Sequence, residues 1–452
     1  MTLALDSKIF GPLFSDSEIA EIFDDEAFLR EMLKVEGALA KVEGKLGVLP
    51  ASAGEQIEEV CRTVVLDPTE IGQGTRRDGV PVIALVKALR KAVGDEAAPF
   101  VHWGATTQDI VDTATVLQIR SAIRIMKQRL GSLIDRLAGL ADRHRATVMA
   151  ARTHGQQALP ISFGFKVAGW LAPLLRHRER LINQCTDLLQ LQFGGAAGSL
   201  AALGENGLPV MQGLAKELEL SLAIMPWHSQ RDVFGEFAGW LSMLTASLAK
   251  IGQDVILLAQ NEVGEVLESG GEDRGGSSSM PQKRNPILSE CIISAARTNA
   301  SLLSAIHNAM IQEHERATHG WQVEWLTLSQ MMLLTGGALA NTLVLVQNIQ
   351  INKAQMRHNL GTTNYLVLAE AAVQALSGEI PRTEAHALVK QACKIAVGED
   401  RSLIEVVKKQ FSQIAPQNKI DWKALAQPEN YLGQVEHFID SVLAQVKRPS
   451  GR

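Results

Sequence analysis

Residues 229–268 read SQRDVFGEFAGWLSMLTASLAKIGQDVILLAQNEVGEVLE, and this stretch decides the fold. Its apolar side chains recur at steps of three and four residues, which is the spacing of a helix face rather than of a strand. They are Val233, Phe234, Phe237, Trp240, Leu241, Leu244, Leu248, Ile251, Val255, Leu258 and Val266. We therefore expect one helix of about 60 Å, at about 1.5 Å per residue. Residues 255–259 are apolar on more than one face, so several neighbouring helices must bury them.

Proline placement extends this interpretation to the rest of the chain, because proline disrupts a helix interior. Three long segments contain no proline: those between Pro99 and Pro160, between Pro226 and Pro281, and between Pro286 and Pro381. Their apolar residues follow helical spacing, and no stretch alternates convincingly as a strand would. The sequence predicts an all-α fold in three parts: an N-terminal helical domain (1–109), a central long-helix bundle (110–352) and a C-terminal helical domain (353–452).

Composition excludes several classes of protein. The chain has 452 residues, a net charge of −5 and 21% charged residues, which is ordinary for a globular protein and does not indicate nucleic-acid binding. No uncharged apolar run reaches the length of a membrane span, and the N-terminus does not resemble a secretion signal, so we expect a cytoplasmic protein without membrane contact. The four cysteines are scattered without metal-ligand spacing, so neither a metal site nor a disulfide framework is expected.

Residues 269–286 form the most unusual segment, SGGEDRGGSSSMPQKRNP, between two expected long helices. Its glycines, serines and prolines cannot continue a helix. Composition alone favours a solvated linker. A loop of this length is also uncommon, and such loops are often functional.

The order of residues in this loop favours a functional site. Residues 276–286, GSSSMPQKRNP, resemble the signature G-S-S-x-M-P-x-K-x-N-P of the fumarase and aspartase superfamily. Residues 102–109 (HWGATTQD) and 152–160 (RTHGQQALP) resemble two further shared regions of that family, in the expected order. The resemblance implies a three-domain helical subunit, a homotetramer with a 20-helix core, and active sites assembled from three subunits. It also implies a small polycarboxylate substrate and no cofactor.

The chemistry of that family needs a base and a dense set of hydrogen-bond donors. Removing a proton next to a carboxylate creates an aci-carboxylate dianion, which donors around the carboxylate stabilise. By resemblance, Ser277 is the general base, while Lys283 and Asn285 contact the intermediate. Ser278 and Met280 are the further substrate contacts of the same loop. On spacing alone, Lys283 is equally a solvated loop cation.

His154 and Glu290 form the second catalytic pair that the resemblance implies. His154 lies across the substrate from the loop serine, where it assists the leaving group or holds a carboxylate. Glu290 stands 13 residues after Ser277, where lyases of the family carry a glutamate that orients this histidine. A carboxylate behind an imidazole fixes its tautomer and favours its charged form. Taken alone, His154 is more simply a hydrogen-bonded structural residue.

Thr106, Thr107 and Gln108 resemble the carboxylate-binding cluster of the first region, and His102 resembles the histidine of the adenylosuccinate lyase pattern H-x-G-x-T-S-x-D. The two threonines also suit a helix cap, with Asp109 shortly after them. Both roles are compatible.

Three more substrate contacts follow from the same comparison of motifs. Thr153 precedes His154, Gln230 lies in the segment WHSQRD (227–232), and Arg316 ends the run QEHER (312–316). The charged run around Arg316 is also explained as a solvated helix face.

Two signals disagree about the branch of the family. Residues 227–232, 193–204 and 312–316 resemble the 3-carboxy-cis,cis-muconate cycloisomerase branch. That branch, however, has Thr-Trp-Leu-Gln where this chain has Thr153-His154-Gly155-Gln156, and a small residue at the position of Glu290. We therefore predict a fumarate-releasing lyase, with C–N cleavage of an N-substituted aspartate or a related succinyl compound. The lactonizing cycloisomerase is the alternative, and a non-catalytic relative comparable to the lens crystallins is a third reading.

Overall fold

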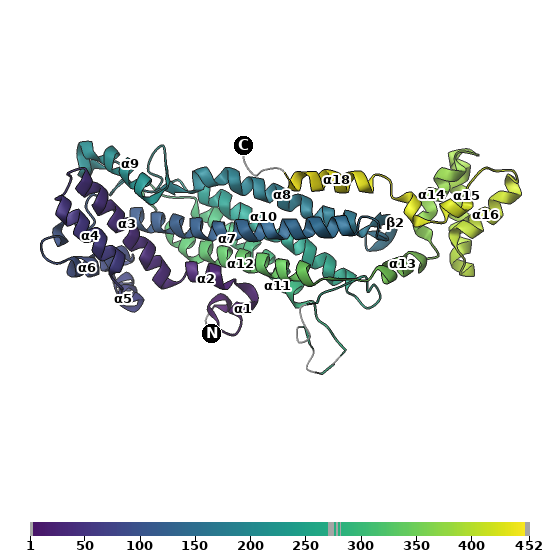
Figure 1. Ribbon diagram of the computed structural model, residues 1–452, viewed down its shortest axis with the longest axis horizontal. Coiled ribbons are helices and arrows are strands. Elements are labelled where there is room, and N and C mark those ends of the chain that lie inside the picture. Colours follow the sequence, from purple (N-terminus) through teal and green to yellow (C-terminus); the bar gives the residue numbers. More distant parts are fainter. Residues whose placement is uncertain (1–2, 270–274, 277–278, 281, 448–452) are drawn as a thin grey trace.

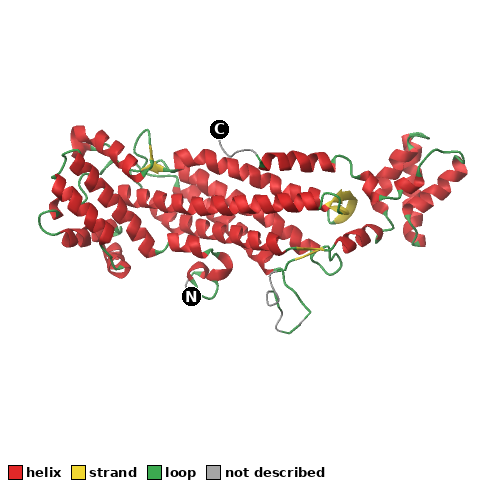
Figure 2. Cartoon of the chain, in the orientation of Figure 1, coloured by secondary structure: helices red, strands yellow, loops and turns green. Residues whose placement is uncertain are grey.

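The computed structural model describes residues 3–269, 275–276, 279–280 and 282–447. It is an elongated bundle in which long helices run side by side, with the N-terminal helices at one end and the C-terminal helices at the other (Figure 1). Helices dominate the cartoon, and the strands are short (Figure 2). The all-α class predicted from the sequence is confirmed.

The middle of the molecule consists of long helices that pack on one another. They are α7 (Thr107–Arg143), α8 (Phe163–Leu188), α10 (Asp232–Leu258), α11 (Ile287–Ala309) and α12 (Gly320–Asn348). Helix α10 contacts α8, α11 and α12, so it is surrounded on several sides, as its apolar pattern requires. Phe237 and Trp240 stack in its buried face with ring centres 5.9 Å apart.

The expected helix over residues 229–268 is shorter at its C-terminal end. Helix α10 stops at Leu258, and the chain turns where the amides of Val263 and Gly264 both donate to the carbonyl of Gln260. Gly264 has a φ of +57°, a left-handed conformation that glycine adopts without steric cost. Val266 belongs instead to the two-residue strand β5 (Val266–Leu267), which pairs with β6 (Gln350–Ile351). A buried valine fits both periods, so spacing alone extended the helix too far.

The structure also contains a hairpin that the sequence pattern did not predict. Strand β1 (Val148–Thr153) pairs antiparallel with β2 (Gln156–Ser162), with an irregularity between Ala150 and Arg152. Its apolar residues do not alternate regularly, and Pro160 lies within β2, so the period-2 signal is weak. The remaining strands are the parallel pair β3 (Gln190–Leu191) and β4 (Ser221–Leu222).

Shorter helices form the two ends. At the N-terminal end these are α3 (Asp25–Lys45), α4 (Ala51–Thr63), α5 (Pro68–Asp78), α6 (Val82–Val93) and, from later in the chain, α9 (Gly207–Leu218). The short helices α1 (Gly11–Phe14) and α2 (Ser17–Ile22) lie instead against the side of the bundle, where both contact α12 (Figure 1). After the bundle come α13 (Lys353–Gly361), α14 (Ala369–Leu376), α15 (Arg382–Glu399), α16 (Leu403–Ile414), α17 (Trp422–Leu425) and α18 (Val435–Val446). Short 3-10 turns occupy Ala4–Asp6, Ala98–Phe100, Ala201–Asn206, Leu366–Leu368 and Pro428–Tyr431.

Two clusters of buried apolar residues hold these elements together. The larger cluster joins the N-terminal helices to the long bundle, and the smaller cluster joins α14, α15 and α16 with the first residues of β1. Helix α18 turns back and packs along α8, so the end of the chain lies beside the bundle (Figure 1).

Helices α10 and α12 are long and apolar enough to cross a membrane by length and composition alone. Their most apolar stretches are 56% and 61% buried within this single chain, as expected of the core helices of a bundle.

Candidate active site

The residues singled out in the sequence fall at two opposite ends of α7. The first group, here called the arginine cluster, lies at the N-terminal end of α7 and comprises His102, Thr106, Thr107, Gln108, Gln230 and Arg316. The second group, here called the hairpin cluster, lies at the other end and comprises Thr153, His154, Met280, Lys283, Asn285 and Glu290. Helix α7 has 37 residues, which at about 1.5 Å per residue separates the two ends by about 54 Å.

Three predicted residues of the arginine cluster are in direct contact. Arg316 donates from Nη1 to Oγ1 of Thr106 at 2.7 Å and from Nε to Oε1 of Gln108 at 3.3 Å. Among the described residues, Nη2 of Arg316 has no protein partner, so it remains available to a ligand. The solvated-face interpretation of the 312–316 run therefore does not describe Arg316, which lies in the connection between α11 and α12 and reaches back to α7.

Thr106 caps α7, as the capping hypothesis predicts. Its side chain and that of Asp109 form a reciprocal capping box, in which the Thr106 amide donates to Oδ2 of Asp109 at 3.0 Å. Asp109 is fully buried and also accepts from the amides of Gly194 and Gly195, at 2.9 Å each. The glycine-rich segment 193–204 therefore fixes the start of α7 through its backbone.

A buried ionic network lies behind the arginine cluster, and the sequence analysis did not identify it. Arg231 donates from Nη1 to Asp112 at 2.7 Å and from Nε to Glu324 at 2.8 Å. Trp321 donates to the same Asp112 at 2.9 Å. Gln108 donates to Asp112 at 3.1 Å, which connects the network to the cluster. One feature of the sequence could have indicated this network, because Glu324 stands between Trp321 and Trp325 on a helix that is otherwise apolar.

Electrostatics in this network depend on the pairing of its charges. Burial by itself lowers the pKa of Arg231, but Asp112 and Glu324 more than compensate, and the net direction is upward. Burial raises the pKa of Glu324, although Arg231 opposes the change. The guanidinium carbon of Arg231 also lies 4.8 Å from the ring centre of Phe234.

His102 occupies the loop before α7 with a φ of +64°, a conformation that is uncommon for residues other than glycine. Its Nδ1 is 2.6 Å from Oε1 of Glu36 on α3. Thr107 and Gln230 complete the arginine cluster. Thr107 is the first residue of α7, and Gln230 is exposed and lines a cavity with Trp227 and Asp232.

His154 lies at the tip of the hairpin between β1 and β2. His154 and Gly155 have φ values of +51° and +77°, as the two central residues of a type I′ turn require. Thr153 and Gln156 pair directly beneath this turn. Both Thr153 and His154 are exposed on the single chain.

The hairpin is attached to the loop that follows α10. Arg152 forms a bidentate pair with the buried Glu265, at 2.7 and 2.9 Å. Three residues further on, Glu268 accepts from the amides of Leu288 and Ser289 in the first turn of α11, at 2.8 and 3.1 Å. The hairpin, both stems of the loop 269–286, here called the serine loop, and the start of α11 are therefore connected to one another.

The described part of the serine loop is itself closed by backbone pairing. The amide of Asn285 donates to the carbonyl of Gly275 at 2.9 Å, and Gly276 pairs with Arg284. A Cβ on Gly275, whose φ is +80°, would lie 2.6 Å from the carbonyl oxygen of Asn285, so a larger residue is excluded there. Lys283 and Met280 are exposed. Ser277 and Ser278 lie outside the described residues.

Glu290 lies in the first turn of α11 and is exposed on the single chain. Within the described residues of this chain, no hydrogen bond joins Glu290 to His154. The role of Glu290 in orienting His154 therefore stays a prediction.

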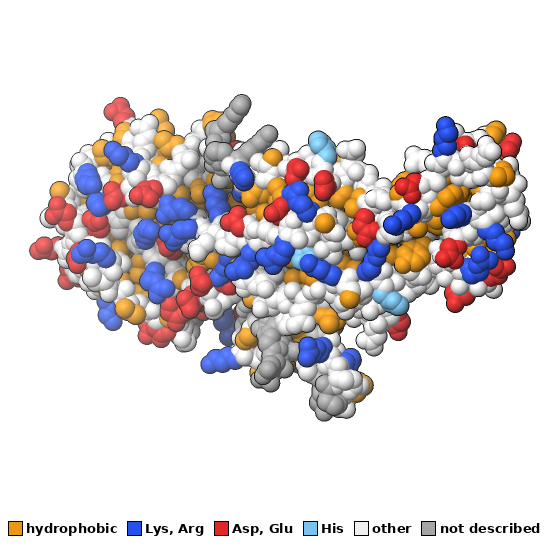
Figure 3. Space-filling model, turned by 45° about the vertical axis from the view of Figure 1, so that its right-hand side comes forward, with side chains coloured by type: hydrophobic (Ala, Val, Ile, Leu, Met, Phe, Trp, Pro, Cys, Tyr) orange, Lys and Arg blue, Asp and Glu red, His pale blue; other side chains and the backbone are white. Residues whose placement is uncertain are grey.

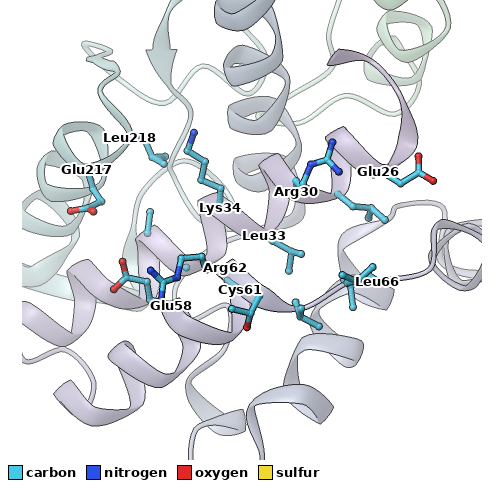
Figure 4. A pocket seen from close by; sticks show the side chains of 16 residues that line it. Glu26, Arg30, Leu33, Lys34, Glu58, Cys61, Arg62, Leu66, Glu217 and Leu218 are labelled. Atoms are coloured by element: carbon cyan, nitrogen blue, oxygen red, sulfur yellow. The ribbon is translucent and has the colours of Figure 1, made fainter. Parts of the chain in front are cut away.

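The N-terminal domain also contains a cavity of about 480 Å³ between α3, α4 and the end of α9. Figure 4 shows that Arg30, Lys34 and Arg62 approach it together with Glu58 and Glu217. None of the residues predicted for the active site lines this cavity.

Two family models match the chain. A family model described as lyase matches residues 15–298, and a second, described as the adenylosuccinate lyase C-terminus, matches residues 366–442. The chain belongs to the fumarase/aspartase superfamily. It is therefore an enzyme of the lyase superfamily, as the sequence predicted, and enzymes of this superfamily act on small carboxylate substrates.

Relatives within the superfamily cover nearly the whole chain. A 3-carboxy-cis,cis-muconate cycloisomerase of Pseudomonas aeruginosa is 44% identical over 97% of this chain and 96% of its own length. The crystal structure of 3-carboxy-cis,cis-muconate lactonizing enzyme from Pseudomonas putida covers 98% of this chain and 99% of its own, with a TM-score of 0.92 and 40% identity. An N-acetyl-S-(2-succino)cysteine lyase of Enterococcus italicus is 34% identical over 95% of this chain and 94% of its own length.

Proposed function

We propose that this enzyme lactonizes 3-carboxy-cis,cis-muconate or a close analogue. The observation that carries the proposal is the similarity to cycloisomerases over nearly the whole chain, at 44% identity for the Pseudomonas aeruginosa protein. The sequence alone favoured elimination from an N-substituted aspartate, with the cycloisomerase as the alternative. The comparisons favour the alternative, so we reverse the order of the two reactions.

The described residues suit the chemistry of lactonization. One carboxylate oxygen of the substrate forms a C–O bond to an alkene carbon, and the neighbouring carbon takes up a proton, so the reaction balances without an added redox partner. The negative charge that develops next to a carboxylate needs positioned donors. The guanidinium Nη2 of Arg316 supplies one. Because Oγ1 of Thr106 accepts from Arg316, its own hydroxyl proton is left for a ligand oxygen.

We propose that the active enzyme is a homotetramer whose sites combine residues of different subunits. The two clusters lie about 54 Å apart along α7 in one chain, and a small substrate cannot span that distance. The bundle also exposes large apolar side chains, with Leu257 on α10 48% exposed and Leu326 on α12 68% exposed. Hydrophobic side chains are visible at the surface of the bundle in Figure 3. Such surfaces favour subunit contact.

Elimination from a succinyl compound remains the second candidate, because of His154. His154 is exposed at the tip of the hairpin, and its imidazole has no hydrogen-bond partner among the described residues, so it is available to a ligand. An imidazole suits protonation of a leaving amine or thiol. The relative named N-acetyl-S-(2-succino)cysteine lyase gives this reaction class a precedent within the family.

A substrate panel separates the two reactions. The purified chain is incubated with 3-carboxymuconate, with adenylosuccinate and other N-substituted aspartates, and with N-acetyl-S-(2-succino)cysteine, and lactone and fumarate are quantified. We expect lactone from 3-carboxymuconate. Fumarate release without any lactone would overturn the proposal in favour of the second candidate. Light scattering tests the assembly, with an expected mass of four chains of 49.0 kDa.

A further inference from the structure

Glu36 is a buried carboxylate that contacts the arginine cluster from behind. It lies on α3 with 1% of its surface exposed, and its Oε1 is 2.6 Å from Nδ1 of His102. The two residues are 66 positions apart, so this contact depends on the packing of α3 against the loop before α7. A buried carboxylate at this distance fixes which imidazole nitrogen carries the proton.

His102 offers its other nitrogen to a ligand. Its side chain is 17% exposed, and among the described residues Nε2 has no hydrogen-bond partner. Four residues after His102 in the sequence comes Thr106, whose hydroxyl oxygen accepts a hydrogen bond from Arg316. The imidazole is therefore held at Nδ1 by Glu36, while Nε2 is left for a ligand.

The charges that face His102 come from three helices. Burial lowers the pKa of His102, but Glu36 on α3 and, more weakly, Asp109 on α7 raise it, while Arg90 on α6 lowers it. The net direction is above the ordinary value of 6.5. Glu36 is thus the main group that raises the pKa of His102 against the opposing effect of burial.

Glu43 is a second buried acid on α3, and it differs from Glu36 in having no imidazole beside it. It is completely buried, and within the part of the chain that the structure describes neither of its carboxyl oxygens has a hydrogen-bond partner. Burial, together with the nearby Glu36, raises the pKa of Glu43 to about 9, so Glu43 is neutral at physiological pH. Glu43 therefore provides a matched comparison: an equally buried acid on the same helix that carries no charge.

We propose that Glu36 is a positioning residue, which keeps His102 in its imidazolium form and oriented so that its Nε2–H donates to a carboxylate of the substrate. This assignment rests on the proposed function, because it places the substrate at the arginine cluster. A charged donor stabilises an anionic substrate more strongly than a neutral one. The consequence is a binding step that weakens when His102 loses its proton.

The first test measures the titration of His102 without any substrate. Histidine labelled with ¹³C at Cε1 is followed by NMR in the full-length protein, and the His102 resonance is identified by its loss in His102→Gln. In Glu36→Gln the titration midpoint should fall by about one pH unit or more, whereas Glu43→Gln should leave it unchanged. An equal shift in both variants, or a wild-type midpoint below 6.5, would overturn the proposal.

The second test measures binding with the substrate that the panel identifies. In Glu36→Gln, KM should rise about tenfold at pH 8, since one unit of pKa is a tenfold change in the charged fraction. At pH 6 the same variant should be close to wild type, with kcat nearly unchanged at both values. Glu36→Asp, which keeps the charge, should restore most of the loss. If Glu36→Gln does not fold, His102→Gln, which removes the proposed imidazolium donor, replaces it and should raise KM at pH 6 as well. In Glu36→Gln, a KM that increases equally at both pH values would show a purely structural role.

The two tests separate the failure of this inference from that of the proposed function. The NMR titration requires no turnover, so it stands even if none of the panel substrates reacts. A shifted titration together with an unchanged KM on a working substrate would place the substrate away from His102 and overturn the assignment.

Discussion

Arg316 donates from Nη1 to the hydroxyl oxygen of Thr106 across 2.7 Å, although the two residues are 210 positions apart. The bond joins the connection between α11 and α12 to the cap of α7. It gives Thr106 a second acceptor role beside its capping box. The helix cap therefore coincides with the ligand site that we propose, and changes at Arg316 should affect catalysis more than folding.

Arg316→Ala should raise KM for the working substrate about 10- to 150-fold, because a hydrogen bond to a charged group contributes about 1.5–3 kcal/mol. Steady-state kinetics with Arg316→Ala measure this effect. Arg401→Ala, which removes an arginine paired with Glu399 beyond the bundle, is the matched control and should retain wild-type KM. An unchanged KM in Arg316→Ala would remove this residue from the binding site.

Arg231→Met should destabilise the fold by about 3–5 kcal/mol, because it leaves the buried carboxylates of Asp112 and Glu324 without their cation. Urea unfolding at one fixed protein concentration gives the difference in free energy. Lys250→Ala breaks an ion pair whose lysine side chain is 62% exposed, and it should cost about 1 kcal/mol or less. Equal effects of both variants would show that burial does not govern the contribution of the network.

Glu43→Gln should stabilise the protein, and increasingly so as pH rises. The pKa of Glu43 is raised from 4.5 to about 9 in the folded state. Its contribution to stability is therefore fully present below pH 4.5 and is lost progressively up to about pH 9. A neutral glutamine avoids this loss, so the advantage of the variant should grow by up to about 1.4 kcal/mol per pH unit.

Urea midpoints of wild type and Glu43→Gln between pH 5 and pH 9 test this slope. Glu55→Gln changes an exposed acid on α4 and should leave the pH dependence of stability unaltered. A constant difference between Glu43→Gln and wild type across the range would mean that Glu43 is ionised in the folded protein.

The sequence predicted the fold class correctly because long helices leave a strong local signal. Spacing of three and four residues located α10, and the proline-free segments located α7, α11 and α12. Helix α8 was not located in this way, because it contains Pro173. Spacing did not locate the end of α10, since Val266 satisfies the helical period while belonging to β5. The hairpin around His154 was missed because a two-residue turn and irregular strands give little periodicity, and its stability depends on distant partners such as Glu265.

The motifs named candidate site residues but not the partners that those residues contact. Thr106 and Gln108 were identified within one short motif, and the structure adds their contact with Arg316. Glu36, Asp112 and Glu324 were not identified, because each becomes informative only when a distant cation or imidazole packs against it. Local sequence cannot show such pairs, because the same acidic residue on a helix is buried or exposed depending on how that helix packs in the folded protein.

Mixing two variants, each impaired when assayed at a substrate concentration well below KM, tests whether the sites are shared between subunits. Arg316→Ala damages the arginine cluster and His154→Gln the hairpin cluster, which lie at opposite ends of the 37-residue helix α7. If a site combines clusters from different chains, hybrid tetramers contain some sites with both clusters intact. Co-expression of the two variants with different affinity tags should therefore restore measurable activity in the doubly tagged fraction.

The matched control pairs Arg316→Ala with Thr106→Val, because both changes lie in the same cluster. Each arginine cluster is made by residues of a single chain. Every chain in this pair carries either Arg316→Ala or Thr106→Val, so no site contains an intact arginine cluster. This pair should therefore recover no activity. If doubly tagged hybrids of the first pair also remain inactive, while His154→Gln alone abolishes turnover, the two clusters do not serve a common site. The two clusters, which lie at opposite ends of a helix about 54 Å long, would then serve two independent functions rather than one shared site.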